Sequence, residues 1–229
     1  MRKHLIWSLG LALALTVAGV AWANGTQSLS WSIKPTKLSK TVYKRVKLTV
    51  SAKLSPQSPA PSDQSPSDVK LAFPKGIKFN ASGIGKCPER TIRNGGSCPS
   101  SEIVGKGISR IYGPRGNSLL PLLTLYNGRT SSKGTPTVIL QGEFPPNSGL
   151  IVGTFSENAG GTLDIKFPHF AGGRAVLTFF TFTFAKPSYA SARCPAKTLT
   201  VKSVFTYAAS GSAGAPTQSP SATIKCEQR

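Results

Sequence analysis

The chain has 229 residues, with 28 lysines and arginines against 8 aspartates and glutamates, which gives a formal net charge of +20 at pH 7. This length suffices for one sizeable core or two small ones. Acids and histidines are too scarce for an acidic calcium-binding cluster, and they leave few groups for proton-transfer chemistry. The surplus of cations attracts polyanions. The alternative is that positive charge scattered along the chain only keeps an exported protein soluble.

The first 23 residues are predicted to form a secretory signal peptide. A basic head at residues 2–4 precedes an apolar stretch at 5–20 and a small-x-small exit at 21–23, which is the order typical of such leaders. The alternative is an uncleaved anchor, because the apolar run approaches the ~20 residues that span a bilayer. Cleavage would leave residues 24–229 with a net charge of +18, and no later segment is apolar enough to span a membrane.

The first strands show the alternation of a half-buried sheet, in which successive side chains point to opposite faces. Leu29, Trp31 and Ile33 share one face, with serines between them. Over residues 42–54 every second side chain is again apolar, with Lys44 the one exception, and the opposite face is rich in lysine and arginine. This pattern predicts a strand with a basic solvent-exposed face.

A proline- and serine-rich segment at residues 55–68 interrupts the pattern. Such a composition can neither pack well nor pair in a β-ladder. As a linker between domains it would leave only about thirty residues upstream, fewer than normally fold alone. We therefore expect a long surface loop within a single domain.

Alternation returns at residues 69–73, 163–167, 180–184 and 199–207, and glycine- and asparagine-rich turns separate these runs. Beyond the leader, no window of a dozen residues shows a helical period with capping residues. About ten short strands at this spacing predict an all-β fold. The expected architecture is one antiparallel β-sandwich domain over residues 24–229, with a β-barrel as the alternative.

Four cysteines, Cys87, Cys98, Cys194 and Cys226, remain after the leader. An even number in an exported chain indicates disulfides, and of the three possible pairings sequence proximity favours Cys87–Cys98 and Cys194–Cys226. A zinc site would need closely spaced cysteines with histidines, whereas the leader is followed by a single histidine, His169. Phosphate-loop and dinucleotide motifs are also missing. We expect no metal ion and no other cofactor.

Candidate catalytic groups are few. His169 lies between aromatic residues, five positions after Asp164, but no Gly-x-Ser-x-Gly motif supplies a nucleophile. Glu143 and Glu157 could face each other across a sugar if their strands paired, although surface acids paired with lysines are the simpler interpretation. The prediction is a non-enzymatic protein. The alternative is an exported hydrolase that uses His169 or the pair Glu143 and Glu157.

The best binding candidate is the segment from residue 34 to residue 53, which contains seven cations, one tyrosine and no acid. Nucleic-acid readers normally add several stacking aromatics or an element that enters a groove. An anionic polymer of the cell envelope is therefore the expected partner, rather than a specific nucleic acid, and a purely structural surface protein is a further alternative. The candidate residues are Lys34, Lys37, Lys40, Tyr43, Lys44, Arg45, Lys47 and Lys53.

Short structural motifs run along residues 70–226. They are Cys87-Pro88, Ser97-Cys98-Pro99, Gly105 with Gly107, Tyr126-Asn127-Gly128, Gly160-Gly161 with Leu163, Cys194-Pro195 and Cys226. The layout resembles a set of secreted, uncharacterised all-β proteins common in high-GC Gram-positive bacteria. The resemblance implies a single-domain sandwich with two local disulfides, and it implies no functional residue because that group has no assigned activity. We expect a secreted protein, either extracellular or associated with the cell wall.

Overall fold

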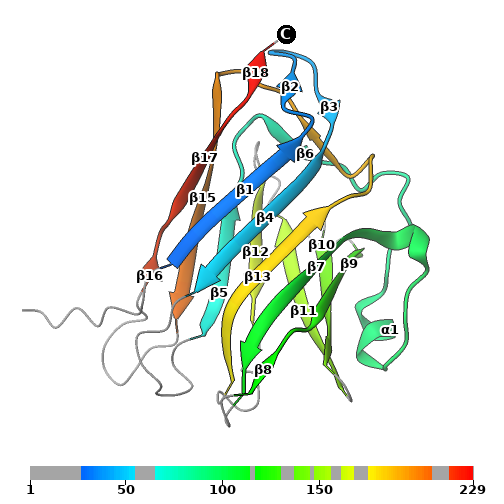
Figure 1. Ribbon diagram of the computed structural model, residues 1–229. Helices are drawn as coiled ribbons and strands as arrows, with labels where there is room; N and C mark the ends of the chain where they lie inside the picture. The colour runs from blue at the N-terminus through cyan, green and yellow to red at the C-terminus, as the bar shows by residue number, and fades with distance from the viewer. Residues whose placement is uncertain are drawn as a thin grey trace, which may run out of the picture.

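The computed structural model describes residues 27–54, 65–113, 117–129, 137–144, 147–155, 161–167, 175–207 and 217–228. Almost all of its elements are strands, so the all-β prediction is confirmed (Figure 1). The strands are β1 (Gln27–Lys34), β2 (Lys37–Leu38), β3 (Lys44–Arg45), β4 (Lys47–Leu54), β5 (Pro66–Ala72), β6 (Ile77–Phe79), β7 (Ile103–Tyr112), β8 (Ser118–Leu119), β9 (Leu122–Asn127), β10 (Thr137–Phe144), β11 (Asn147–Phe155), β12 (Thr162–Lys166), β13 (Val176–Phe184), β14 (Ala190–Ala192), β15 (Thr198–Tyr207), β16 (Thr217–Gln218), β17 (Ser221–Lys225) and β18 (Glu227–Gln228).

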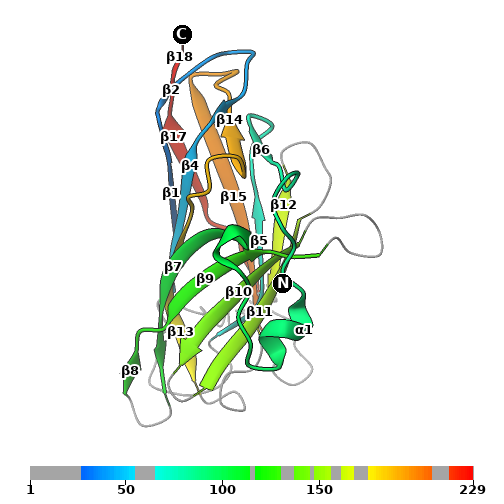
Figure 2. The ribbon, with the colours of Figure 1, turned by 90° about the vertical axis from the view of Figure 1, so that its right-hand side faces the viewer.

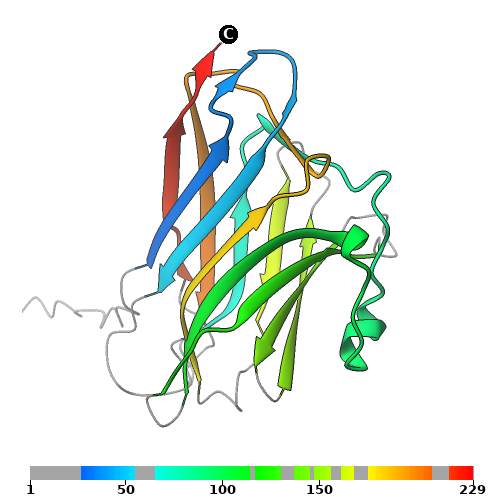
Figure 3. The ribbon, with the colours of Figure 1, turned by 45° about the vertical axis from the view of Figure 1, so that its right-hand side comes forward.

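One antiparallel sheet of 13 strands forms the body of the molecule. Its order is β1-β4-β13-β7-β9-β10-β11-β12-β5-β15-β16, with β17 beside β15 and β8 beside β7. The sheet curls until it is nearly closed into a barrel (Figures 1 and 3). Of the two predicted architectures, the barrel alternative thus describes the curvature better than two separate sheets do.

The two ends of this sheet meet along a seam between β1 and β17. Halfway along it, the indole Nε1 of Trp31 donates a hydrogen bond to the carbonyl oxygen of Ala222 at 2.9 Å. At the upper end, β18 pairs in parallel with β2, and Lys37 lies opposite Glu227. The seam is therefore joined by one side-chain hydrogen bond below and a short backbone ladder above.

The predicted strand at residues 42–54 is interrupted in the structure. Only β4 joins the large sheet, whereas β3 pairs with β14 in a separate three-stranded sheet of order β3-β14-β6. Val46 bridges the two, because its N–H donates to the carbonyl oxygen of Ala190 at 3.0 Å. The expectation that Val42 is buried is wrong, since 62% of its surface is exposed. The exception at Lys44 marks the place where the chain changes sheets.

The interior is filled by the alternating aromatic residues of β13. Phe180, Phe182 and Phe184 are buried, as expected for a core strand. On the opposite face, the hydroxyl groups of Thr181 and Thr183 form hydrogen bonds with hydroxyl groups of β4 at 2.6 and 2.8 Å. Each buried ring contributes about 1.5–3 kcal/mol to the free energy of unfolding. Period-two patterning thus assigns the two faces of this strand correctly.

Both predicted disulfides are present, Cys87–Cys98 and Cys194–Cys226. The first closes a loop that carries the short helix α1 (Glu89–Arg93) and the 3-10 turn η2 (Ser100–Glu102). Buried Ile92 of that loop packs with Tyr126 and Ile139 to form a second, smaller core on the outer face of β9 and β10. The second disulfide ties the start of β15 to the C-terminal strands. Such bridges form and persist in oxidising compartments outside the cytosol.

The predicted surface loop at residues 55–68 is partly replaced by a strand. β5 begins at Pro66, which is buried and lies opposite Tyr207. Proline is tolerated at the first residue of a strand because the missing N–H is not needed there. Residues 55–64 and the predicted signal peptide at 1–23 lie outside the described residues. Within the part of the chain that is described, no helix has the length and apolar character needed to cross a bilayer.

Candidate functional site

The eight predicted binding residues do not form one surface. Lys34 and Lys47 lie directly opposite each other at the ends of β1 and β4. Lys53 is at the far end of β4, six residues from Lys47, so the two Cα atoms are about 20 Å apart. Lys37 lies in the seam, where its ammonium group is 3.5 Å from the carboxylate of Glu227. The segment is therefore divided among several places, and Lys40 is exposed in the turn between β2 and β3.

Tyr43 is the residue around which cations gather. Its hydroxyl donates a hydrogen bond to the carbonyl oxygen of Lys75 at 2.8 Å, which fixes the ring. The ammonium nitrogen of Lys78 lies over that ring, 4.3 Å from its centroid, and the guanidinium carbon of Arg193 lies 5.1 Å from it. Cation–π contacts of this kind contribute about 0.5–1 kcal/mol each at exposed sites. The ring thus holds two cations near each other despite their mutual repulsion.

The three-stranded sheet explains why these residues meet. Ser191 of β14 lies opposite Arg45 of β3 on one side and opposite Lys78 of β6 on the other. Residues directly opposite in an antiparallel sheet point to the same face. Arg45, Lys78 and the Tyr43 ring therefore share the outer face of this sheet, and Arg193 follows two positions after Ser191. We call the set Tyr43, Arg45, Lys78 and Arg193 the Tyr43 cluster.

No acid neutralises this cluster within the described residues. The three salt bridges found there join Lys37 to Glu227, Lys70 to Asp164, and Arg93 to Glu89. The Nε atom of Arg193 is buried and has no hydrogen-bond partner among the protein atoms described.

Sequence reasoning identified two members of the Tyr43 cluster and missed the other two. Tyr43 and Arg45 were predicted because they belong to the basic segment. Lys78 and Arg193 lie 35 and 150 positions after Tyr43 and reach it only through the pairing of β14 with β3 and β6. Neither residue lies in a run of cations, so no local signal could have identified them. Lys44 adjoins the cluster in sequence and is exposed.

A pair of carboxyl groups on β5 and β12 was also missed. Asp68 and Asp164 share a hydrogen bond, and Lys70 and Lys166 lie opposite them in the ladder. Burial, followed by the hydrogen bond to Asp164 and its negative charge, raises the pKa of Asp68 to about 6. The Lys70 ammonium group, 3.9 Å from Asp164, partly opposes this effect. The pair lies on the outer face of the barrel.

Only some of the residues of the hydrolase alternative lie within the described part of the chain. His169 and Glu157 lie outside the described residues, and the side chain of Glu143 is exposed on β10. A cavity inside the barrel is lined by β7 and β9–β13, and among its described lining residues Ser109 is the polar one. With no acid or imidazole among its described lining residues, this cavity offers no proton-transfer group.

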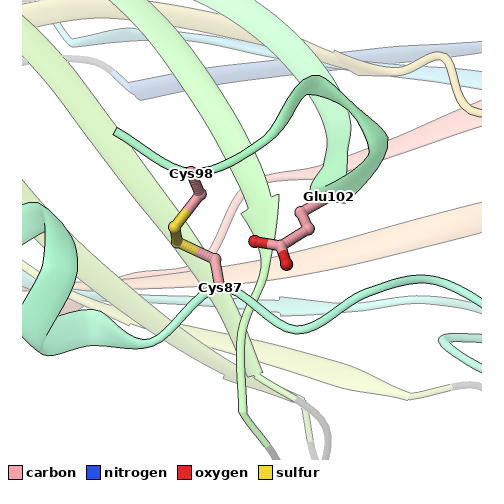
Figure 4. A group of neighbouring side chains, drawn as sticks. All are labelled: Cys87, Cys98 and Glu102. Atoms are coloured by element: carbon pink, nitrogen blue, oxygen red, sulfur yellow. A yellow bond between two sulfur atoms is a disulfide. The ribbon is translucent and has the colours of Figure 1, made fainter. Parts of the chain in front are cut away.

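Glu102 lies beside the first disulfide, and its carboxylate points toward Cys87 and Cys98 (Figure 4). The grouping resembles a metal site only by proximity. Both sulfur atoms are used in the disulfide, whereas zinc and other soft metals bind thiolates. Glu102 alone would be left as a ligand, so this arrangement does not suit a metal ion.

Comparison with known proteins adds no further constraint. No protein-family model, curated protein or solved structure matches this chain. The resemblance to secreted proteins of high-GC Gram-positive bacteria therefore stays a prediction. The function has to be inferred from the chemistry of the surface.

Proposed function

We propose that the protein is a secreted or wall-associated, non-enzymatic binding module that holds anionic envelope polymers at the Tyr43 cluster. One observation carries the proposal: Lys78 and Arg193, from separate segments, lie against the Tyr43 ring, and Arg45 shares their face of the sheet, without an acidic partner among the described residues. A cluster assembled from separate segments is less easily explained by a composition that merely favours solubility.

The geometry suits a chain of repeating anions better than a single small one. Arg45 and Lys78 are exposed on the outer face of the β3-β14-β6 sheet, so a polymer that lies across this face could contact both. Guanidinium groups bind phosphate and carboxylate in bidentate fashion, whereas the Lys78 ammonium group acts as a point charge. The rest of the positive net charge supplies long-range attraction toward the polymer.

The test measures retention on immobilised polyphosphate and on immobilised poly-glutamate across a range of salt concentrations. Binding through ion release should weaken steeply with salt. Arg45→Gln with Lys78→Gln should reduce the affinity. It should also make a plot of log affinity against log salt concentration less steep, because fewer ions are released on binding. The matched control, Lys202→Gln with Lys225→Gln, removes the same charge from exposed positions of β15 and β17. Equal losses in the two double variants would show that the charge acts diffusely, and would overturn the assigned site.

A further inference from the structure

A second surface with a different chemistry lies around β8. Of the six large hydrophobic side chains that are exposed in the described part of the chain, four lie close together on β7, β9 and the connection from β8 to β9. Ile108 and Leu122 are direct cross-strand neighbours on β7 and β9. We call the four residues the β8 patch: Ile108 (41% exposed), Tyr112 (40%), Leu120 (59%) and Leu122 (58%). Leu119, also exposed, lies opposite buried Ile111 and so points to the other face of the sheet.

The β8 patch continues an apolar face that is covered elsewhere. Farther along the same face, Tyr126 on β9 and Ile139 on β10 are only 5% and 1% exposed, because the loop of the first disulfide packs over them. At Ile108 and Leu122, nearer to β8 on the same face, the described chain provides no such cover. Contiguous exposed apolar patches are rare on soluble domains and mark interaction sites.

Positive charge borders the β8 patch. Lys53 and Arg110 lie on either side of half-buried Phe179 in one row of the sheet, and Lys106 follows on the outer face of β7. Glu143, opposite Leu122, is the acid at this edge among the residues described. A second copy of the chain would bring like charges together across such a contact. An anionic partner would match them.

The position of β8 favours a planar partner. β8 and the adjoining ends of β7 and β9 lie at the lower end of the described chain, whereas β6 and β14, which carry part of the Tyr43 cluster, lie toward the opposite end (Figure 2). Exposed leucines at this extremity can reach the apolar layer of a membrane without being blocked by the described body of the chain. Tyrosine favours the zone between headgroups and acyl chains, and arginine and lysine bind the phosphates there.

We propose that the β8 patch docks on the surface of an anionic lipid bilayer. Leu120 and Leu122 enter the headgroup region, and Tyr112 lies at the interface. Arg110 and Lys53 contact lipid phosphates beside them. This site is separate from the Tyr43 cluster, so either proposal can fail without the other.

The test uses the exported, disulfide-bonded protein, with the N-terminus of each sample defined by mass spectrometry so that an uncleaved apolar leader is not mistaken for the patch. Cosedimentation is measured with vesicles of phosphatidylcholine alone and with vesicles containing roughly one third phosphatidylglycerol. The wild type should bind the anionic vesicles more strongly and should be released by salt. Leu120→Ser with Leu122→Ser should lower the partition coefficient about tenfold or more.

Val42→Ser is the matched control, because Val42 is equally exposed but lies beside the Tyr43 cluster. It should leave vesicle binding unchanged, and near-UV circular dichroism should show that all variants are folded. Undiminished vesicle binding by the leucine variant would overturn the proposal. So would a wild-type dimer that this variant converts to a monomer without loss of vesicle binding, because a second copy would then cover the patch. Loss of vesicle binding only in Arg45→Gln with Lys78→Gln would assign lipid contact to the other end and also overturn it.

Discussion

The indole nitrogen of Trp31 and the carbonyl oxygen of Ala222, 191 positions apart in sequence, are joined by a 2.9 Å hydrogen bond across the seam between β1 and β17. Trp31 is otherwise buried, with 6% of its surface exposed. This bond ties the first described strand of the sheet to one of the last. It is therefore one of the long-range contacts that close the barrel, beside the pairing of β18 with β2.

Trp31→Phe should weaken this closure while keeping an aromatic ring in the core. The carbonyl group of Ala222 loses its donor, and the smaller ring leaves space behind. We expect the free energy of unfolding to fall by about 1–3 kcal/mol. Urea unfolding followed by circular dichroism measures it, with Ser32→Ala, an exposed neighbour on β1, as the control. An unchanged midpoint would mean that the seam is held by other contacts.

The carboxyl pair of Asp68 and Asp164 predicts a dependence of stability on pH. The pKa of Asp68 is about 6 in the folded protein and 3.8 in the unfolded reference. Between these values the folded state binds more protons, so the contribution of Asp68 to the free energy of unfolding falls as pH rises. Asp68→Asn stays neutral, and it should raise the melting temperature relative to the wild type at pH 7.

The advantage of Asp68→Asn should shrink as pH is lowered below 6 and should vanish near 3.8. Melting curves of both proteins across this window give the difference directly. Glu143→Gln, which removes an exposed acid that forms none of the salt bridges found among the described residues, controls for the change in net charge. A difference between Asp68→Asn and the wild type that is constant across the window would contradict the prediction.

Gly107 permits the close approach of β7 and β13. It lies opposite Phe182, and a Cβ atom added to it would overlap the carbonyl oxygen of Thr181 and approach the Phe182 Cα to 2.8 Å. Gly107→Ala should therefore separate the strands and lower the free energy of unfolding by about 1–3 kcal/mol. Denaturant titration provides the measurement, with Lys106→Ala as the exposed neighbouring control. Stability equal to the wild type would show that the strands can separate at no cost.

The two disulfides should differ in their contributions. Their cysteines are separated by 11 and 32 positions, and a longer closed loop removes more entropy from the unfolded chain. Replacing Cys87 and Cys98 by alanine should cost about 3 kcal/mol, and replacing Cys194 and Cys226 about 4 kcal/mol. Guanidinium unfolding of the two double variants tests the order. The reverse order would indicate that the small core around Ile92 depends on its disulfide more than loop entropy predicts.

Local alternation was sufficient to predict the main strands, because each strand has one buried and one exposed face. Leu29 to Ile33 in β1, and Phe180 to Phe184 in β13, follow this pattern fully. Both disulfides were predictable from proximity alone. The break at Lys44 was visible in the sequence only as one cation among apolar residues, because a change of sheet depends on which distant strand is available for pairing.

The candidate site was less predictable than the fold. The sequence shows that residues 34–53 are basic, but only the pairing of β14 brings Lys78 and Arg193 to Tyr43. Neutralisation of Lys37 likewise depends on Glu227, near the other end of the chain. The Asp68–Asp164 pair arises from the register of β5 and β12. All three contacts join residues that are far apart in sequence, so the periodicity within one segment cannot predict them.

The seam has a consequence for where the sheet opens. Within the described strands, the ladder between β1 and β17 is replaced by packing and one side-chain bond, whereas β13 is paired on both sides. Amide protons along the seam should exchange with solvent before those of β13, because fewer bonds must break to expose them. Breathing of the barrel would start there, between the first and last parts of the sheet.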